Sequence, residues 1–167
     1  VAFANDGKTM PPQNLSVIVR DGNYYLTFEN VPGNNGYEVV VNGTTNVVEK
    51  DVTTVPINVK SGSEFSVKIR TICADETRTS DFYETTLVIG RALSAPEKLT
   101  ISADKKLSFS AVDGAASYDV VINGVSVLKS ATKTEIELID VLTSPINYEI
   151  KVRANGDNRL TFDSKFS

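Results

Sequence analysis

The sequence of 167 residues contains no histidine, no tryptophan and a single cysteine, Cys73. Without histidine, neither a His-based catalytic triad nor the usual kind of zinc site can be built. A lone cysteine cannot form an internal disulfide, so we expect Cys73 to be a small packing residue. Glycine-rich phosphate loops are missing too. These absences remove the groups on which most enzyme and metal sites depend.

Long apolar runs and concentrated positive charge are also missing. The longest apolar run, around residues 39–41, has the length of a strand, whereas a membrane-spanning helix needs roughly 20 residues. The 17 basic residues are scattered singly among 21 acidic ones, and a nucleic-acid binder needs a basic face. We therefore predict no membrane span and no nucleic-acid partner.

The acidic residues do not indicate catalysis either. A glycosidase needs two carboxylates that face one site. Acidic residues such as Glu38, Asp119 and Glu149 instead alternate with apolar neighbours, so we expect them to point into solvent. The sequence predicts no enzyme, no catalytic residue, no metal site and no cofactor.

The most informative feature is an internal repeat. Leu26, Phe28 and Tyr37 recur as Leu107, Phe109 and Tyr118 at one offset of 81. The offset drifts to 84 between blocks, as expected when loops gain or lose residues. The matched blocks are 24–43 with 105–124, 65–70 with 148–153, and 12–17 with 96–101. A repeat of about 80 residues suits a whole small domain rather than a solenoid unit.

The hydrophobic pattern within each repeat has a period of two, which is typical of antiparallel strands with one buried face. Asn42-Gly43 and Asn123-Gly124, each between apolar runs, predict hairpins with type I′ turns. The predicted strands are 13–19, 23–29, 36–42, 44–49, 54–59, 63–71 and 82–89, then 97–102, 105–110, 116–122, 125–129, 134–139, 147–153 and 160–167.

From these strands we predict two domains, over residues 10–90 and 91–167, which follow a flexible lead-in over residues 1–9. Within the lead-in, Ala2-Phe3-Ala4 resembles the cleavage site of a signal peptide, although Val1 could equally follow a removed initiator methionine. The segment between the domains is too short for a free tether, so we expect limited bending there.

The order of the motifs resembles fibronectin type III domains, in particular the divergent forms of bacterial secreted enzymes, adhesins and phage virion proteins. Pro-x-x-Leu precedes Leu-x-Phe, which is followed by Gly and Tyr-x-Val-x-(Val/Ile)-Asn-Gly and then by (Phe/Tyr)-x-(Val/Ile)-x-(Ile/Val)-Arg. The resemblance covers about residues 10–167. It implies an all-β fold of two tandem seven-stranded antiparallel β-sandwiches of the immunoglobulin-like class.

The sequence departs from the family pattern at three places. Phe28 and Phe109 stand where the family has a core tryptophan. The tyrosine that begins the sixth strand is kept as Tyr148 but is Phe65 in the first repeat, where its hydrogen bond cannot form. Arg-Gly-Asp is absent, so the integrin adhesion of animal members is not implied.

Exposed aromatic residues and one loop are the candidate binding surface. By parity, Tyr24 faces the core and Tyr25 faces solvent, while Phe82 packs inward like Phe166 and leaves Tyr83 outside. The loop Asn155-Gly156-Asp157-Asn158 offers oxygen ligands that could bind Ca²⁺, but turns favour Asn, Gly and Asp for backbone reasons as well. Ordinary surface residues remain the alternative interpretation in both cases.

The end of the second repeat is a candidate partner edge. Phe82 begins a strand that runs on to residue 89, whereas Phe166 is followed by Ser167 alone. Part of strand 147–153 therefore risks unpaired backbone groups, which invite another strand. The candidate edge consists of Tyr148, Ile150, Val152 and Phe166. It could meet a partner, a continuation of the protein or another copy.

Two functions remain open from the sequence. The first is a non-catalytic structural spacer or display module, extracellular, on a bacterial cell surface or a phage virion. The second is a recognition module that binds a carbohydrate or a surface protein through its loops or an open sheet edge. The sandwich itself serves many functions and does not decide between them.

Overall fold

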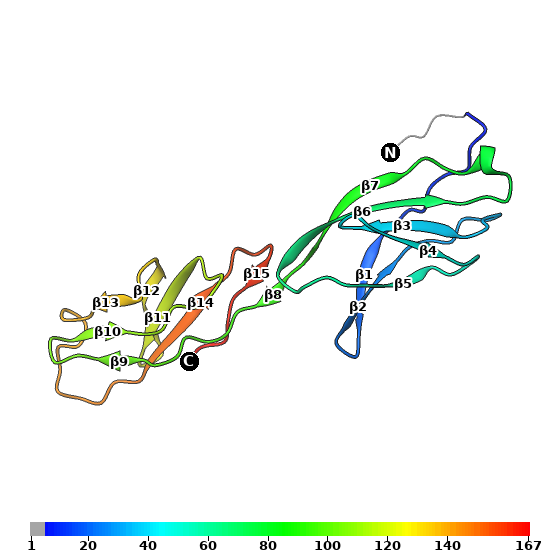
Figure 1. Cartoon of the computed structure of the whole chain (residues 1–167). Helices are drawn as coiled ribbons and strands as arrows, with labels where there is room; N and C mark the ends of the chain where they lie inside the picture. The colour runs from blue at the N-terminus through cyan, green and yellow to red at the C-terminus, as the bar shows by residue number, and fades with distance from the viewer. Residues whose placement is uncertain (1–5) are drawn as a thin grey trace. The chain divides into compact units, whose positions relative to one another are not determined.

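The structure is a computed structural model that describes residues 6–167 (Figure 1). The chain divides into two compact units between Ile89 and Gly90. The architecture is all-β, as the period-two pattern predicts. Apart from the single 3-10 turn η1 (Glu76–Arg78), the part of the chain that the structure describes contains strands, turns and loops only.

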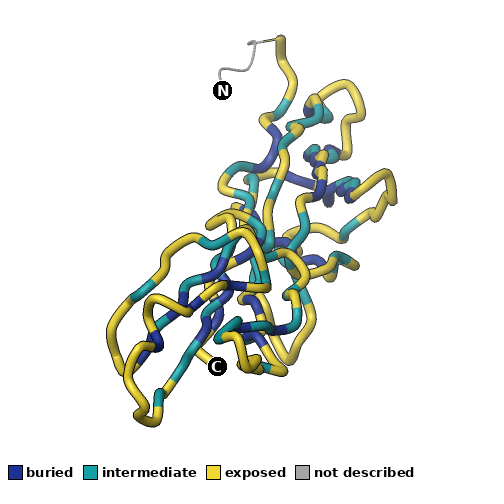
Figure 2. Tube along the Cα trace, turned by 90° about the vertical axis from the view of Figure 1, so that its left-hand side faces the viewer, coloured by how far each residue is buried: buried dark blue, intermediate teal, exposed yellow. Residues whose placement is uncertain are grey.

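The first unit is a sandwich of two antiparallel sheets. One sheet has the order β1-β2-β5, with β1 at Ser16–Arg20, β2 at Asn23–Thr27 and β5 at Thr54–Ile57. The other has the order β4-β3-β6-β7, with β4 at Thr44–Val48, β3 at Tyr37–Val41, β6 at Ser63–Thr71 and β7 at Tyr83–Ile89. The nine residues of β6 alternate between buried and more exposed positions, because one face of its sheet covers the core. Figure 2 shows how buried, intermediate and exposed stretches follow one another along the trace.

The second unit repeats this arrangement with shorter strands. One sheet has the order β13-β10-β9, with β13 at Glu135–Glu137, β10 at Lys106–Ser108 and β9 at Thr100–Ile101. The other has the order β12-β11-β14, with β12 at Val125–Ala131, β11 at Ser117–Ile122 and β14 at Ile150–Asn155. A short parallel pair joins β8 (Arg91–Ala92) to β15 (Thr161–Phe162).

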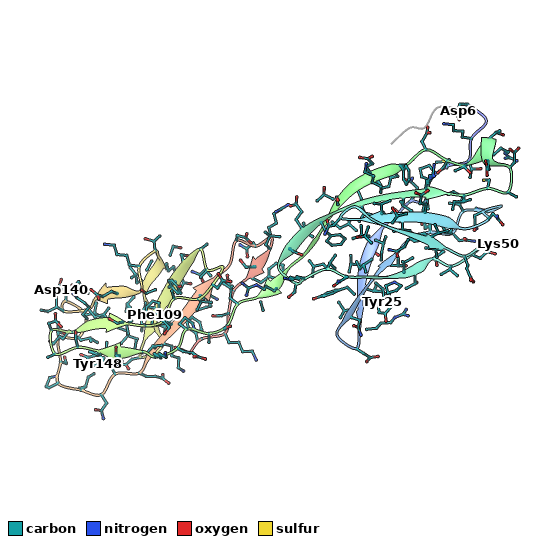
Figure 3. The ribbon with its side chains drawn as sticks, in the orientation of Figure 1. Asp6, Tyr25, Lys50, Phe109, Asp140 and Tyr148 are labelled. Atoms are coloured by element: carbon teal, nitrogen blue, oxygen red, sulfur yellow. The ribbon has the colours of Figure 1, made fainter. Side chains whose placement is uncertain are left out.

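Each unit has its own core, built around the same aromatic pair. The rings of Phe28 and Tyr37 meet edge to face at 4.9 Å, and those of Phe109 and Tyr118 do so at 4.9 Å as well. Both phenylalanines are buried, and Figure 3 shows Phe109 within the second unit. The tyrosine hydroxyls accept equivalent hydrogen bonds from the backbone N–H groups of Val31 and Val112. The predicted core positions of the two phenylalanines are thus confirmed.

The two Asn-Gly hairpins also have the predicted geometry. Asn42 and Gly43 have φ angles of 47° and 83°, and Asn123 and Gly124 have φ angles of 50° and 79°. Both central residues of each turn are therefore left-handed, as a type I′ turn requires. In addition, the side-chain oxygen of Asn123 accepts a hydrogen bond from the N–H of Glu149 at 2.8 Å, and Asn42 does the same in the first unit.

The last predicted strand differs from the structure. Of residues 160–167 only Thr161 and Phe162 form a strand, and they pair in parallel with β8. The predicted strand 147–153 begins later, at Ile150. In the first unit, β6 lies between β3 and β7. Its counterpart β14 has a neighbouring strand on one side only among the described residues, so the last predicted strand does not pair with it.

The expected lead-in lies partly outside the described residues, since the structure describes nothing of residues 1–5. Its last residues contact the first unit. The N–H of Thr9 donates to the carbonyl oxygen of Arg78 at 2.8 Å, and the ammonium of Lys8 lies 2.6 Å from the carboxylate of Asp81.

Candidate interaction surfaces

The two candidate surface tyrosines lie in different environments. Tyr25 is half-buried on β2, where it pairs with Ile18 of β1 and Pro56 of β5, and the guanidinium of Arg20 lies 5.9 Å from its ring centre (Figure 3). Its ring lies on the side of β2 opposite to buried Leu26, as parity predicts.

The predicted orientation of Tyr83 was wrong. Tyr83 packs against the core of the first unit, and Phe82 is the residue outside, with the guanidinium of Arg70 at 4.7 Å from its ring centre. Phe166 repeats this arrangement on Arg153 at 5.2 Å and is 41% exposed. The expectation that both phenylalanines pack inward failed because β7 begins at Tyr83, so the inward positions start one residue later.

The candidate loop after β14 is stabilised by its own aspartate. The Oδ1 atom of Asp157 accepts hydrogen bonds from the N–H groups of Arg159, Leu160 and Thr161 at 2.8, 2.8 and 3.0 Å. These backbone hydrogen bonds, that of Thr161 first, lower the pKa of the Asp157 carboxyl below its usual value. Asn158 has a φ of 60° and donates its N–H to the carbonyl oxygen of Thr161. The carboxylate therefore holds the turn.

Asn155 belongs to a polar network on the outer face of β14. Its amide donates to the Oγ of Ser117 at 3.1 Å and to the carboxylate of Asp119 at 2.8 Å. Arg153 reaches the other oxygen of Asp119 at 2.7 Å. Desolvation opposes the charge on Asp119, but the hydrogen bonds from Ser130, Asn155 and Arg153 outweigh it and lower the pKa of this carboxyl. Three of the candidate loop residues are thus engaged in internal contacts.

The partner edge predicted along β14 is covered at one end. Ser164 and Ala154 exchange hydrogen bonds, because the serine N–H donates to the alanine carbonyl and its Oγ accepts from the alanine N–H. Ser167 does the same with Val152. The sequence analysis missed this serine clamp, although the repeated Ser-x-Phe at Ser80 and Ser164 was a signal for it. In the first unit, Ser80 clamps Thr71 in the same way.

The other end of the edge contains Tyr148 and Ile150, and both are half-buried. The hydroxyl of Tyr148 accepts from the N–H of Ser144 and donates to its carbonyl oxygen, both at 3.0 Å. This is the corner hydrogen bond that the resemblance implies for this tyrosine and that Phe65 cannot make. It fixes the loop ahead of β14.

The described residues show neither a metal cluster nor a membrane helix. Within residues 6–167, no three acidic or cysteine side chains are grouped so that they could hold a metal ion. Over the same range no helix has the length and the apolar character that spanning a membrane requires. Cys73 is buried and lies 3.2 Å from the hydroxyl of Thr9.

No protein-family model and no curated protein matches the chain. A two-domain fibronectin type III segment of chicken tenascin is similar in structure, with a TM-score of 0.53 and 15% identity over 94% of this chain and 96% of that one. This likeness confirms the predicted fold and is informative about the fold alone.

Two further solved structures match with lower TM-scores. The central fibronectin-III array of RIM-binding protein has a TM-score of 0.40 and 16% identity, over 90% of this chain and 64% of that one. The spore cortex lytic enzyme SleM of Clostridium perfringens has a TM-score of 0.38 and 18% identity, over 47% of this chain. The matched part spans 29% of the SleM chain.

Proposed function

We propose that this chain, which has the tandem fibronectin type III fold, is a non-catalytic structural module that spaces or displays other parts of a bacterial cell-surface or phage virion assembly. The observation that carries the proposal is the correspondence of 94% of the chain to a two-domain segment of that fold. The fold thus accounts for nearly all of the chain, which supports a scaffold role.

The polar side chains offer further support. Asp157 is bonded to the backbone of its own turn, and Asp119 is paired with Arg153. Catalytic carboxylates commonly have their pKa raised by burial or by a neighbouring acid. Both of these carboxyls have a lowered pKa, because hydrogen bonds hold them in the charged form. This pattern suits a structural role.

Recognition of a carbohydrate or a surface protein is the second candidate function, and Tyr25 is the observation that favours it. Its ring lies on the outer face of the β1-β2-β5 sheet, half-buried beside Arg20. Aromatic rings with a polar tip are common anchors in binding surfaces. One such ring on a face is ordinary, however, so the spacer role takes precedence.

A glycan array and a pull-down from cell-surface extracts separate the two functions. A spacer gives no glycan signal and no partner that depends on Tyr25. A recognition module gives a signal that Tyr25→Ala abolishes and that Val47→Ala, at a 74% exposed position on β4, leaves unchanged. A Tyr25-dependent signal would replace the spacer proposal with the recognition proposal.

A further inference from the structure

The larger sheet of the first unit ends at β4. Among the described residues, β4 pairs with β3 on one side and with no strand on the other (Figure 1). The pairing with β3 is unbroken, from Thr44 opposite Val41 to Val48 opposite Tyr37. All residues of β4 except Val48 are exposed, and Val47 is 74% exposed. Because β4 lies between β3 and β5 in the chain, its free side follows from the fold of the unit itself.

The hairpin geometry determines which backbone groups of β4 are free. In a two-residue hairpin such as the one at 42–43, the flanking residues exchange both of their hydrogen bonds, and these are Val41 and Thr44. Backbone groups alternate along an antiparallel ladder, so every second residue from Thr44 onward bonds to β3. The residues between them, Thr45 and Val47, direct their N–H and C=O groups away from β3. The strand thus presents donors and acceptors at two positions of its edge.

The edge of β4 lacks the features that keep sheet edges from pairing. Natural edges are blocked by charged residues, prolines, bulges or very short strands. The sequence of β4, Thr-Thr-Asn-Val-Val, has no charge and no proline and is mostly β-branched. Its counterpart β12 is interrupted by two register shifts. Other edge strands of three or more residues in the described part of the chain contain Arg20 (β1), Pro56 (β5), Glu84 (β7), Glu135 (β13) or Lys151 (β14). Among them, β4 is therefore the edge best suited to pairing.

The free groups of this edge are complementary to those of a second copy. When two β4 strands run antiparallel about a twofold axis at Asn46, Thr45 of each copy lies opposite Val47 of the other. Both are then hydrogen-bonded pairs, so every outward N–H and C=O group of the two strands has a partner. Any other antiparallel register leaves some of these groups unpaired. A twofold contact of this kind closes at the dimer, because each copy uses the same surface.

The side chains and charges around β4 permit this register. Thr45 and Val47 lie on the outer face of the sheet, since their partners on β3 are Val40 and Glu38 rather than the buried residues. Across the axis a threonine therefore meets a valine, and pairs of β-branched residues suit a sheet surface. The first charged residue after β4 is Glu49, which would lie opposite a glycine of the other copy. No like charges face each other in this arrangement.

We propose that the edge of β4 binds the same edge of a second copy of this chain, which joins two four-stranded sheets into one continuous antiparallel sheet. Main-chain hydrogen bonds supply the affinity in this mode of binding. A second copy offers a strand that is already ordered, whereas a flexible peptide must be ordered at a cost in entropy. This interaction surface goes beyond the proposed spacer role and would stand if that role proved wrong.

The pairing is weak for chains that are free in solution. A strand of this length buries less than the roughly 1,200–2,000 Å² of a stable interface, so we expect a Kd on the order of 0.1–1 mM. Copies that are held close together in an assembly would pair more completely, because their effective concentration reaches the millimolar range. The contact thus suits a module that is present in many copies.

The first test measures amide exchange with solvent by NMR on the full chain, at concentrations below and above this Kd. We expect exchange at Thr45 and Val47 to slow about twofold where half of the chains are paired. Exchange at Thr44 and Asn46, whose N–H groups bond to β3 in the monomer, should change little. Exchange at Thr45 and Val47 that does not depend on concentration would overturn the proposal.

A proline substitution tests the surface. Val47→Pro removes an outward N–H and keeps the hydrogen bonds to β3, since an edge strand tolerates proline where its N–H faces solvent. It should abolish the concentration dependence of sedimentation and of exchange at Thr45. Val47→Thr is the matched control, because it keeps both the branched shape and the N–H, and it should still pair. A dimer that persists in Val47→Pro would assign the contact to another surface and overturn the proposal.

A disulfide trap tests the register and detects pairing that is too weak for sedimentation. At the twofold axis, position 46 faces itself in a non-hydrogen-bonded pair, where the Cα atoms are about 4.5 Å apart and a disulfide can form. Under mild oxidation near the Kd, Asn46→Cys should cross-link roughly tenfold faster than Val125→Cys, a 64% exposed position on β12. Cys73 is buried and is common to both variants. Equal rates of cross-linking would overturn the proposal.

A competing peptide tests whether the occupant is a second copy. A peptide with the sequence of residues 42–50 should slow the cross-linking of Asn46→Cys, because it offers the same strand. A peptide of the same composition in scrambled order should not. Equal inhibition by both peptides would show that the edge accepts any strand, and it would overturn the assignment of a second copy.

Discussion

Phe109 sits between the sheets of the second unit, 7% exposed and edge to face with Tyr118. Replacing it with alanine removes a buried ring and leaves a cavity, so Phe109→Ala should reduce the stability of this unit by about 3–5 kcal/mol. Phe28→Ala is the matched variant, because Phe28 has the same contact with Tyr37. Urea unfolding followed by NMR measures both. An unshifted urea midpoint for either variant would show that the replaced phenylalanine does not belong to the core.

Asp119 gives the second unit a defined dependence on pH. Its pKa is lowered in the folded chain, because the hydrogen bonds from Ser130, Asn155 and Arg153 outweigh the desolvation that opposes the charge. The unfolded chain then binds more protons between the two pKa values, so stability rises with pH there. The contribution is fully present above the unfolded pKa of about 3.9 and is lost as the pH falls through the folded value.

The variant Asp119→Asn should therefore lose roughly 1.5–3 kcal/mol at neutral pH, the range for hydrogen bonds to charged groups. Its stability should also fall less steeply than that of the unmodified chain below about pH 4. Urea melts at several pH values measure this difference. Asp140→Asn, on an exposed turn, is the control (Figure 3). Parallel pH profiles for Asp119→Asn and the unmodified chain would contradict the assignment.

Sequence reasoning at the scale of single residues succeeded where local backbone geometry decides. Asn42 and Asn123 were predicted from the need for positive φ in a type I′ turn, which is a property of two adjacent residues. It failed for Tyr83, because parity depends on where the strand begins. Stacking on Arg70 holds Phe82 outside, and the register of this contact is set by the facing strand.

At the scale of elements, serine hydrogen bonds to the backbone cover the ends of β6 and of its counterpart β14. Ser164→Ala leaves the N–H of Ala154, which is 0% exposed, without its acceptor, and an unsatisfied buried donor costs about 1–3 kcal/mol. Ser80→Ala does the same to Thr71. We expect Ser164→Ala to speed amide exchange in the second unit more than Ser80→Ala does in the first unit. The reason is that β7 still covers β6 after Ser80 is replaced.

Native-state hydrogen exchange checks this prediction at Val152 and Ala154 and at Ile69 and Thr71. Equal acceleration in the two units would show that β7 adds no protection beyond the serine. The sequence analysis did not identify the clamp itself, although Ser-x-Phe recurs at Ser80 and Ser164. Serine is common in this chain, and a hydroxyl that replaces a backbone carbonyl as acceptor leaves no periodic signature.

The open edge, by contrast, was predicted from the sequence. The repeat gave β6 and β14 as equivalents and showed that a segment like β7 does not follow Phe166 within these residues. What the sequence left open was the extent of the exposure. Only the structure shows that Val152 and Ala154 are covered while Ile150 is open, because the coverage depends on the path of residues 163–167.

For the molecule as a whole, we predict that the two units fold independently and with unequal stability. Each has its own core, and the chain divides between Ile89 and Gly90. Residues 6–89 and 90–167, expressed separately, should each give dispersed amide spectra and cooperative urea transitions. The second should unfold at the lower urea concentration, because Tyr148 and Ile150 are half-buried where Phe65 and Val67 are covered, and burial of apolar area contributes about 25 cal/mol per Å².

The full chain supplies the control for this prediction. If the units are independent, its unfolding curve should equal the sum of the two separate curves, since distant sites without shared partners contribute additively. A single transition in the full chain, or a fragment that does not fold alone, would show that the boundary is misplaced. A second unit at least as stable as the first would show that the half-buried Tyr148 and Ile150 cost no stability.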